Sequence, residues 1–262
     1  MVRICMQVRR VPVKLLAAAS ILFGAESALA QNNPEIHAGA AVRIGKGLAH
    51  TVIRTDAKDK SASIGVVFTP GMLEGLPTAT QGEDPDFPYL LLMPTTGPKT
   101  IIDHVVIDWE PEGHPPANVY DVPHFDFHFY LQSQTEQMKV TFNSPNDSAD
   151  PSQQPAPELV PPGYILPPGT AVPGMGVHAI KPTAAEFQHQ PFTATLIYGY
   201  YNQQQTFIEP MASLEFLLSK PSFSASVPRP AAYTKPGAYP STYSINFDAV
   251  NKVYEVSLKG MR

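Results

Sequence analysis

The segment Pro123-His-Phe-Asp-Phe-His-Phe-Tyr130 contains the residues in this sequence that are best suited to chemistry. Side chains alternate between the two faces of a β-strand, so His124, Asp126 and His128 would share one face and the phenylalanines the other. Two imidazoles and a carboxylate supply nitrogen and oxygen ligands of the kind that suits Zn, Mn, Fe or Cu. The segment therefore predicts a strand with a metal-binding face, anchored in the core by its phenylalanines.

Other arrangements of the same residues remain open. On a straight strand, residues four apart have Cα atoms about 13 Å apart, so His124 and His128 only just reach a common ion. A helix would bring the two histidines together at positions i and i+4, as in zinc proteases, but Pro123 and the aromatic neighbours favour a strand. Alternatively the face binds no metal, and Asp126 orients one or both histidines through hydrogen bonds.

Further ligands have to come from other segments. His178 follows a glycine-containing turn at 173–177, and Glu209 ends a candidate strand directly before Pro210. Glu186 is assigned instead to a capping box that begins at Thr183. The predicted metal ligands are His124, His128, His178 and Glu209, and the residues that orient these ligands or add a further one are Asp126, His104 and His114.

The first thirty residues have the organisation of a secretory signal peptide. A basic region, with Arg9 and Arg10, is followed by an apolar run at 15–23 and by Ala28-Leu29-Ala30, a small-residue cleavage motif. The apolar run is much shorter than the about 20 residues that span a membrane. We therefore expect residues 1–30 to be removed, and the protein to be exported to the periplasm or the extracellular medium without a membrane anchor.

Removal of this segment changes the net charge and the cysteine content of the protein, and both changes exclude some classes of function. The full chain has a net charge of −5, and residues 31–262 have −8, because the segment holds four basic residues and one acidic residue. An acidic exported protein has no electrostatic reason to bind nucleic acid or anionic lipid, whereas a small-molecule ligand or self-association stays open. The single cysteine, Cys5, is removed too, which excludes disulfides and thiolate chemistry.

Residues 31–262 are expected to form one mainly β domain, a sandwich or a barrel that could be cupin-like, with a few short helices. The 29 prolines disfavour long helices. Strand-like segments occur in pairs around turn-like connectors, which predicts hairpins at 40–69, 192–209 and 243–258. The segment 143–173 holds nine prolines and predicts an extended insertion or lid.

Four motifs, Gly113-His-Pro-Pro116, the segment 123–130, Gly174-Met-Gly-Val-His178 and Glu209-Pro-Met211, resemble those of a family of exported bacterial proteins. This family is of unknown function and is named after a Thermus protein. The resemblance extends from about residue 39 to the C-terminus, and it implies an exported β-rich domain without an established activity. It also supports the treatment of the four predicted ligands as one cluster.

A weaker likeness is to the cupins, which are barrels that bind a metal through two histidines, an acid and a later histidine. The first motif here reads His-x-Asp-x-His where cupins have His-x-His. The likeness implies a similar set of ligands.

The sequence leaves two functions open. In the first, the protein is a metalloprotein, either a hydrolase or an oxygen-using enzyme, with a divalent Zn, Mn, Fe or Cu ion. In the second, it is a non-catalytic envelope protein for binding or assembly, and its histidine cluster is structural. Whether the protein is an enzyme is left open as well.

Overall fold

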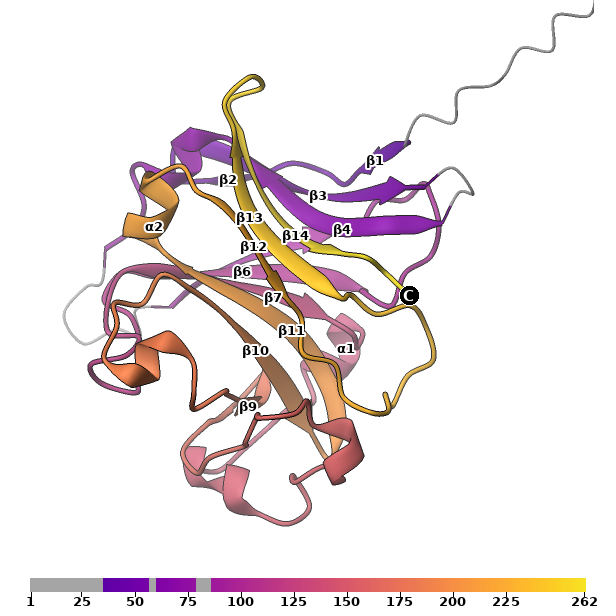
Figure 1. Cartoon of the computed structure of the whole chain (residues 1–262), viewed down its shortest axis with the longest axis vertical. Helices are drawn as coiled ribbons and strands as arrows, with labels where there is room; N and C mark the ends of the chain where they lie inside the picture. Colours follow the sequence, from indigo (N-terminus) through magenta and orange to yellow (C-terminus); the bar gives the residue numbers. More distant parts are fainter. Residues whose placement is uncertain (1–34, 57–59, 79–85) are drawn as a thin grey trace, which may run out of the picture. The chain divides into compact units, whose positions relative to one another are not determined.

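The computed structural model describes residues 35–56, 60–78 and 86–262, which form two antiparallel β-sheets that lie face to face (Figure 1). The prediction of a mainly β fold with a few short helices is confirmed, and the architecture is that of a sandwich of two curled sheets. The predicted signal peptide lies outside the described residues.

The first sheet has the strand order β1-β3-β4-β14-β13-β12, and β2 pairs with β3 beside this path. Its strands are β1 (Ile36–Ala38), β2 (Val42–Ile44), β3 (Gly47–Thr55), β4 (Ser61–Phe68), β12 (Ser222–Ser226), β13 (Thr242–Asp248) and β14 (Val253–Lys259).

The second sheet has the strand order β5-β6-β7-β11-β10-β9-β8, so β7 lies between β6 and β11 in its interior. Its strands are β5 (Phe87–Leu92), β6 (His104–Glu110), β7 (His124–Tyr130), β8 (Ala171–Val172), β9 (Gly176–Ala179), β10 (Ala194–Tyr201) and β11 (Gln204–Ser213).

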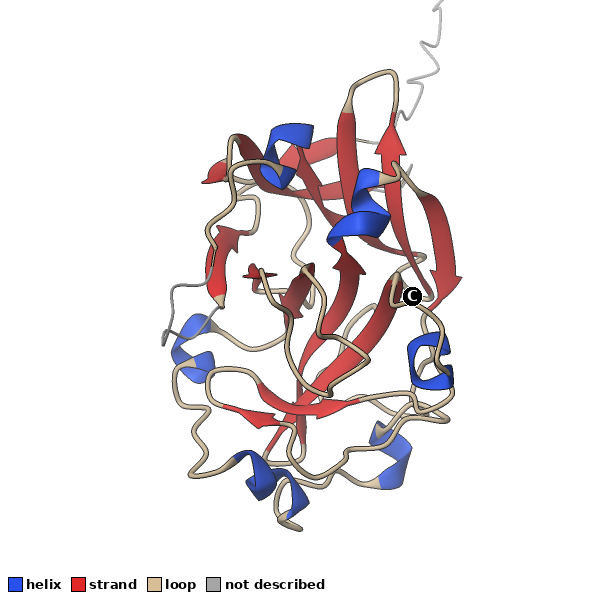
Figure 2. Ribbon diagram, turned by 90° about the vertical axis from the view of Figure 1, so that its left-hand side faces the viewer, coloured by secondary structure: helices blue, strands red, loops and turns tan. Residues whose placement is uncertain are grey.

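Short helices occupy the connections between strands (Figure 2). They are α1 (Gln134–Gln137), α2 (Leu214–Leu218) and the 3₁₀ helices η1 (Pro70–Leu73), η2 (Pro145–Ala149), η3 (Pro157–Leu159) and η4 (Ala185–Gln188). No helix within the described part of the chain is long and apolar enough to cross a membrane.

The three predicted hairpins are confirmed as the antiparallel pairs β3–β4, β10–β11 and β13–β14. In the β10–β11 turn, Asn202 and Gln203 both have positive φ, 47° and 66°, which is the backbone of a tight hairpin turn. The capping-box prediction for Glu186 is wrong. The helix η4 begins after Ala184 without a side-chain cap, and the Glu186 carboxylate instead accepts a hydrogen bond from the Tyr120 hydroxyl.

The core between the sheets explains why β7 is a strand. Phe125, Phe127 and Phe129 are completely buried in a cluster with residues from both sheets, and Phe127 stacks on Phe68 of β4 with ring centroids 6.1 Å apart. Burying each phenylalanine contributes about 1.5–3 kcal/mol, so the alternation fixes which face of β7 turns inward. The histidines and Asp126 must then lie on the opposite face of the second sheet.

That opposite face is covered as well. A smaller apolar cluster lies on it, formed by Val106, Tyr120, Tyr130, Phe192, Ile197, Phe207 and Met211. The proline-rich segment 143–173 contributes η2, η3 and β8, and it is fixed to the β10–β11 hairpin. The Gln153 side chain exchanges hydrogen bonds of 2.7 and 2.8 Å with Asn202, and the Tyr200 hydroxyl donates to the Leu159 carbonyl.

Candidate metal centre

Three neighbouring strands place ionisable side chains on one face of the second sheet. In the β6–β7 register, Asp108 pairs with Asp126 and Glu110 pairs with His124. The β7–β11 register, which pairs Ile208 with Phe129 and Met211 with Asp126, puts Glu209 opposite His128. The acidic and histidine side chains that lie near His124 and His128 on this face are at most 6% exposed, namely Asp108, Glu110, His124, Asp126, His128 and Glu209.

Four of these side chains, with two histidines from outside the three strands, form two groups; within each group the potential ligand atoms all lie within 4.8 Å of one another. We call them the Glu209 group (His128, His178 and Glu209) and the Asp126 group (His114, His124 and Asp126). The structure thus brings three of the four predicted ligands together and places His124 in the adjacent group.

In the Glu209 group, each carboxylate oxygen faces a different histidine. Oε1 of Glu209 lies 3.5 Å from Nε2 of His128, and Oε2 lies 4.0 Å from Nε2 of His178. His128 comes from β7, Glu209 from β11 and His178 from β9. Residues on three strands therefore converge on one point.

Glycine residues allow β9 and the aromatic wall of this group to approach closely. Gly176 has φ of 138°, and a Cβ there would lie 2.6 Å from the Tyr200 carbonyl oxygen, so β9 can pair with β10 only with glycine at this position. A Cβ on Gly199 would overlap the Phe207 ring, which packs against His128 and His178 at centroid distances of 4.7 and 5.3 Å.

The Asp126 group repeats this arrangement. Oδ1 of Asp126 lies 3.3 Å from Nε2 of His124, and Oδ2 lies 3.3 Å from Nε2 of His114. His114 comes from the connection between β6 and β7, and its side chain is 34% exposed, whereas that of His124 is completely buried. The Asp126 group is thus accessible from solvent through His114.

The ring orientation of three histidines is fixed by backbone carbonyls. A carbonyl oxygen only accepts hydrogen bonds, so the Nδ1 atom beside it carries the proton, and Nε2 of the neutral ring has a free lone pair. The pairs are His114 Nδ1 with Pro115 O at 2.7 Å, His124 Nδ1 with Val122 O at 2.7 Å and His178 Nδ1 with Thr170 O at 2.9 Å.

His128 is oriented by a carboxylate instead. Its Nδ1 lies 2.7 Å from Oδ2 of Asp108, and both side chains are 1% exposed. Histidines that bind metals commonly donate their second nitrogen to a carboxylate or a carbonyl in this way. All four histidines of the two groups therefore direct Nε2 toward the carboxylate at the centre of their group.

Several buried polar atoms at this face have no hydrogen-bond partner among the described residues. They are Oδ1 of Asp108, Nε2 of His124, Oδ1 of Asp126, Nε2 of His128 and Oε2 of Glu209. A buried unsatisfied polar group costs about 1–3 kcal/mol. Such atoms clustered around two carboxylates are the environment that a cation would complete.

The distances fit such an ion. Four ligands at about 2.0–2.1 Å from a tetrahedral zinc ion lie about 3.3 Å from one another, which is the separation of histidine nitrogen and carboxylate oxygen in the Asp126 group. The two separations in the Glu209 group are slightly longer.

Burial sets the protonation of the Glu209 group. It raises the pKa of Glu209 well above its usual value, and the charges of Asp126 and Asp108 raise it further. Burial also lowers the pKa of His128 and that of His178 to about 4. At neutral pH both imidazoles are therefore in the neutral form that binds metals, and the carboxyl group needs a nearby cation to be ionised.

The Asp126 group has a different charge distribution. Burial by itself would raise the pKa of Asp126, but His124 and His114 outweigh this effect and hold the pKa below its usual range. For His114, burial lowers the pKa, but the Asp126 carboxylate outweighs it and raises the value to about 9. Asp126 is thus ionised, and an incoming cation would replace a proton on His114.

Sequence analysis did not include Asp108 and Glu110 among the site residues. Burial, followed by Asp126, raises the pKa of both, to about 8 for Glu110. The signal that could have found them is the alternation of residues 104–110, which puts His104, Asp108 and Glu110 on one face of β6 beside the polar face of β7. The hydrogen bond from His128 gives Asp108 an orienting role.

His104, which sequence analysis grouped with the orienting residues, belongs to neither group. Its Nδ1 lies 2.9 Å from Asp103 Oδ1, its Nε2 lies 2.8 Å from Gln137 Oε1, and the ring stacks on Tyr130. Both ring nitrogens are occupied, so His104 is a hydrogen-bonded core histidine. His114 and Asp126, predicted to orient ligands or to add one, both belong to the Asp126 group.

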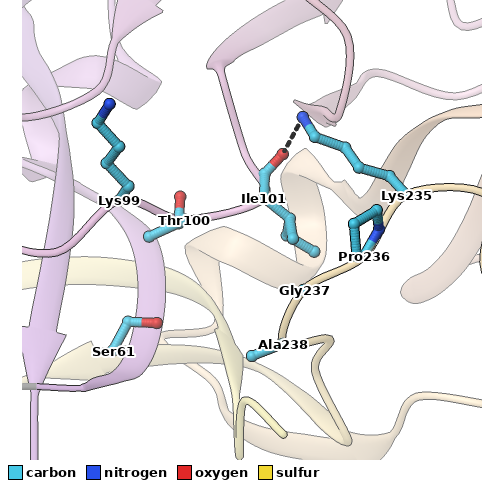
Figure 3. Close-up of a pocket in the computed structure, with 8 residues that line it drawn as sticks. All are labelled: Ser61, Lys99, Thr100, Ile101, Lys235, Pro236, Gly237 and Ala238. Atoms are coloured by element: carbon cyan, nitrogen blue, oxygen red, sulfur yellow. Dashed lines mark hydrogen bonds between the residues drawn. The ribbon is translucent and has the colours of Figure 1, made fainter.

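Two cavities lie elsewhere on the described part of the chain. One, of about 170 Å³, is bordered by Lys99 and Lys235, and the Lys235 ammonium donates to the carbonyl of Ile101 (Figure 3). The same ammonium also donates to the carbonyl of Leu131. The other, of about 390 Å³, is mostly apolar and includes Phe192, whose ring lies 5.5 Å from that of His124. No member of either group lines these cavities.

The fold and the site define a two-sheet β protein with buried histidine–carboxylate groups. The model of the TTHB210-like family, described as "Hypothetical protein TTHB210", matches residues 56–109, which confirms the resemblance to this Thermus-named family over that range. The matched range ends before the motifs at 113–116, 123–130, 174–178 and 209–211. No curated protein and no solved structure matches the chain.

Proposed function

We propose that this protein is an exported metalloprotein and that His128, His178 and Glu209 bind a divalent transition-metal ion. The observation that carries the proposal is the orientation of the two imidazoles. Each has Nδ1 bonded to an oxygen and Nε2 directed at Glu209, and buried atoms of the group lack partners among the described residues.

The ligand set indicates the class of ion. Two imidazoles and one carboxylate are the ligands of catalytic zinc sites and of non-haem iron sites, and they also suit Mn and Cu. An ion bound there would supply a Lewis acid and lower the pKa of a bound water. The protein supplies the rest. Asp108 and the Thr170 carbonyl fix the imidazoles, and Phe207 packs against both rings.

The test is metal analysis of protein purified without a polyhistidine tag, stripped with a chelator and then dialysed against buffered Zn²⁺. We expect ions bound to the wild type and one ion fewer in His178→Ala. His189→Asn is the matched control, because this exposed histidine lies outside both groups, and asparagine tolerates its left-handed backbone at φ of 62°. Wild-type protein without bound metal would contradict the proposal and favour the non-catalytic envelope protein with a structural histidine cluster.

A further inference from the structure

We propose that the Asp126 group is a second cation site, which binds its own divalent transition-metal ion next to the ion of the Glu209 group. The inference rests in part on the proposed function, because both groups share the same sheet face and the same type of ligand. The second site adds one ion to the proposed metalloprotein, and its ligands are His114, His124 and Asp126.

The Asp126 group and the Glu209 group have the same arrangement. In each group a central carboxylate directs its two oxygens at the Nε2 atoms of two different histidines. Each of these histidines has its Nδ1 bonded to an oxygen. Imidazoles whose Nδ1 is bonded to an oxygen and whose Nε2 faces a carboxylate have the orientation of metal-binding histidines.

Two buried atoms face each other in the Asp126 group. Nε2 of His124 and Oδ1 of Asp126 are 3.3 Å apart, and neither has a hydrogen-bond partner in the part of the chain that the structure describes. Because the Val122 carbonyl takes the Nδ1 proton, the neutral His124 ring turns a lone pair toward the carboxylate. Two lone pairs at this distance repel each other, so either a proton on Nε2 or a metal cation has to lie between them.

The two carboxylates are placed to bind two separate ions. Both oxygens of Asp126 face histidines of the Asp126 group, and both oxygens of Glu209 face histidines of the Glu209 group, so neither carboxylate is directed to bridge. Asp126 pairs with Met211 in the β7–β11 register, so Glu209 is its diagonal neighbour, at a Cα separation of about 7–8 Å. We therefore expect two separate ions rather than a bridged pair.

The two sites differ in the solvent exposure of their ligands. The side chain of His114 is 34% exposed, whereas those of His128, His178 and Glu209 are 1, 16 and 2% exposed. An ion with a ligand that reaches the surface has a shorter path to solvent than an ion whose ligands are mostly buried. The ion of the Asp126 group should therefore exchange with solvent faster than the ion of the Glu209 group.

The experiment counts ions per chain in the untagged protein after it has been stripped with a chelator and equilibrated with buffered Zn²⁺. We expect two ions in the wild type and in His189→Asn, one in His114→Ala, one in His178→Ala and none in the double variant. Circular dichroism and thermal melts establish that each variant is folded. His114→Gln replaces His114→Ala if the alanine variant does not fold.

Other ion counts would contradict the second site, the assignment of the Glu209 group, or both. One ion in the wild type that persists in His114→Ala and is lost in His178→Ala overturns the second site and leaves the proposed function intact. One ion that is lost only in His114→Ala overturns the assignment of the Glu209 group instead. One ion that is lost in both single variants shows one shared site and overturns the second site. No ion in the wild type overturns both proposals.

Discussion

Nε2 of His128 lies 3.5 Å from Oε1 of Glu209 across two adjacent strands, and no partner among the described residues donates a hydrogen bond to this nitrogen. The other nitrogen of the ring is bonded to Asp108, so the imidazole is fixed in orientation while its ligand atom is left unsatisfied. A buried group of this kind reduces stability unless something binds to it. The stability of the protein should therefore depend on metal.

Added Zn²⁺ should raise the midpoint of thermal unfolding of chelator-stripped protein. A ligand present at about 100 times its Kd stabilises the folded state by about 2.7 kcal/mol. In a chain of this size each kcal/mol shifts the midpoint by about 2–4 °C, so we expect an increase of about 5–10 °C for each bound ion, which excess chelator reverses. Glu209→Gln should lose the part of the shift that the ion of the Glu209 group contributes, because it removes the charge at the centre of that group. A wild-type midpoint that Zn²⁺, Mn²⁺ and Cu²⁺ all leave unchanged would contradict metal binding.

Asp108→Asn should weaken Zn²⁺ binding by about 10–100-fold without loss of the site, because Asp108 orients His128 and does not belong to either group. Competition with a chromophoric chelator measures the change in Kd. The matched control is Asp103→Asn, which alters a similar aspartate–histidine hydrogen bond, of 2.9 Å to His104, outside both groups. Equal effects of the two substitutions would show that Asp108 does not act through the metal.

Gly176→Ala should displace His178 and weaken the Glu209 group selectively. An added Cβ would meet the Tyr200 carbonyl oxygen at 2.6 Å, so β9 has to move away from β10. Gly174→Ala is the matched control, since Gly174 also has positive φ, 76°, but a Cβ there would meet no atom within 4 Å. Both substitutions should cost about 1–3 kcal/mol of backbone strain. Only Gly176→Ala should also lose one Zn²⁺ ion, and loss of the same ion from Gly174→Ala would contradict this explanation.

Glu110 should make the metal-free protein less stable as the pH rises. Burial raises its pKa from 4.5 to about 8, Asp126 and Asp86 add to the increase, and His114 and His124 oppose it. Between these pH values the unfolded chain ionises Glu110 while the folded chain keeps it protonated, so the equilibrium shifts toward unfolding. In the presence of chelator, the midpoint of the wild type should fall relative to that of Glu110→Gln between about pH 5 and pH 8. Parallel curves for the two proteins would refute the raised pKa.

The alternation of residues 124–130 was sufficient to predict both the strand and its two faces. Phe125, Phe127 and Phe129 do lie in the core, and the face of His124, Asp126 and His128 lies opposite. The same pattern at 104–110 was less visible, because the apolar Val106 interrupts the polar face of β6 between His104 and Asp108. Without strand pairing, nothing in the sequence showed that Asp108 and Glu110 would lie beside Asp126 and His124.

The division of the ligands into two groups was beyond the reach of sequence patterns. Glu209 and His178 approach His128 through the pairing of four different strands, and the register of non-consecutive strands is a property of the whole fold. His114 reaches Asp126 from a connection whose course depends on Gly113, with φ of 72°, and on the hydrogen bond from His114 N to the Tyr120 carbonyl. The motif that contains His114 was visible in the sequence, but the contact of His114 with Asp126 was not.

The proposed export of the chain predicts a processed N-terminus. In a bacterium with an export system, the mature protein should begin at Gln31, because Ala28 and Ala30 are the small residues that signal peptidase requires before the cleaved bond. Intact-mass analysis and N-terminal sequencing of protein from the periplasm or the medium would identify this terminus. Ala30→Asp should leave the precursor uncleaved, while Ala25→Asp, outside the cleavage motif, should be processed normally. Wild-type protein that keeps residues 1–30 and stays in the cytoplasm would contradict export, whether or not the protein binds metal.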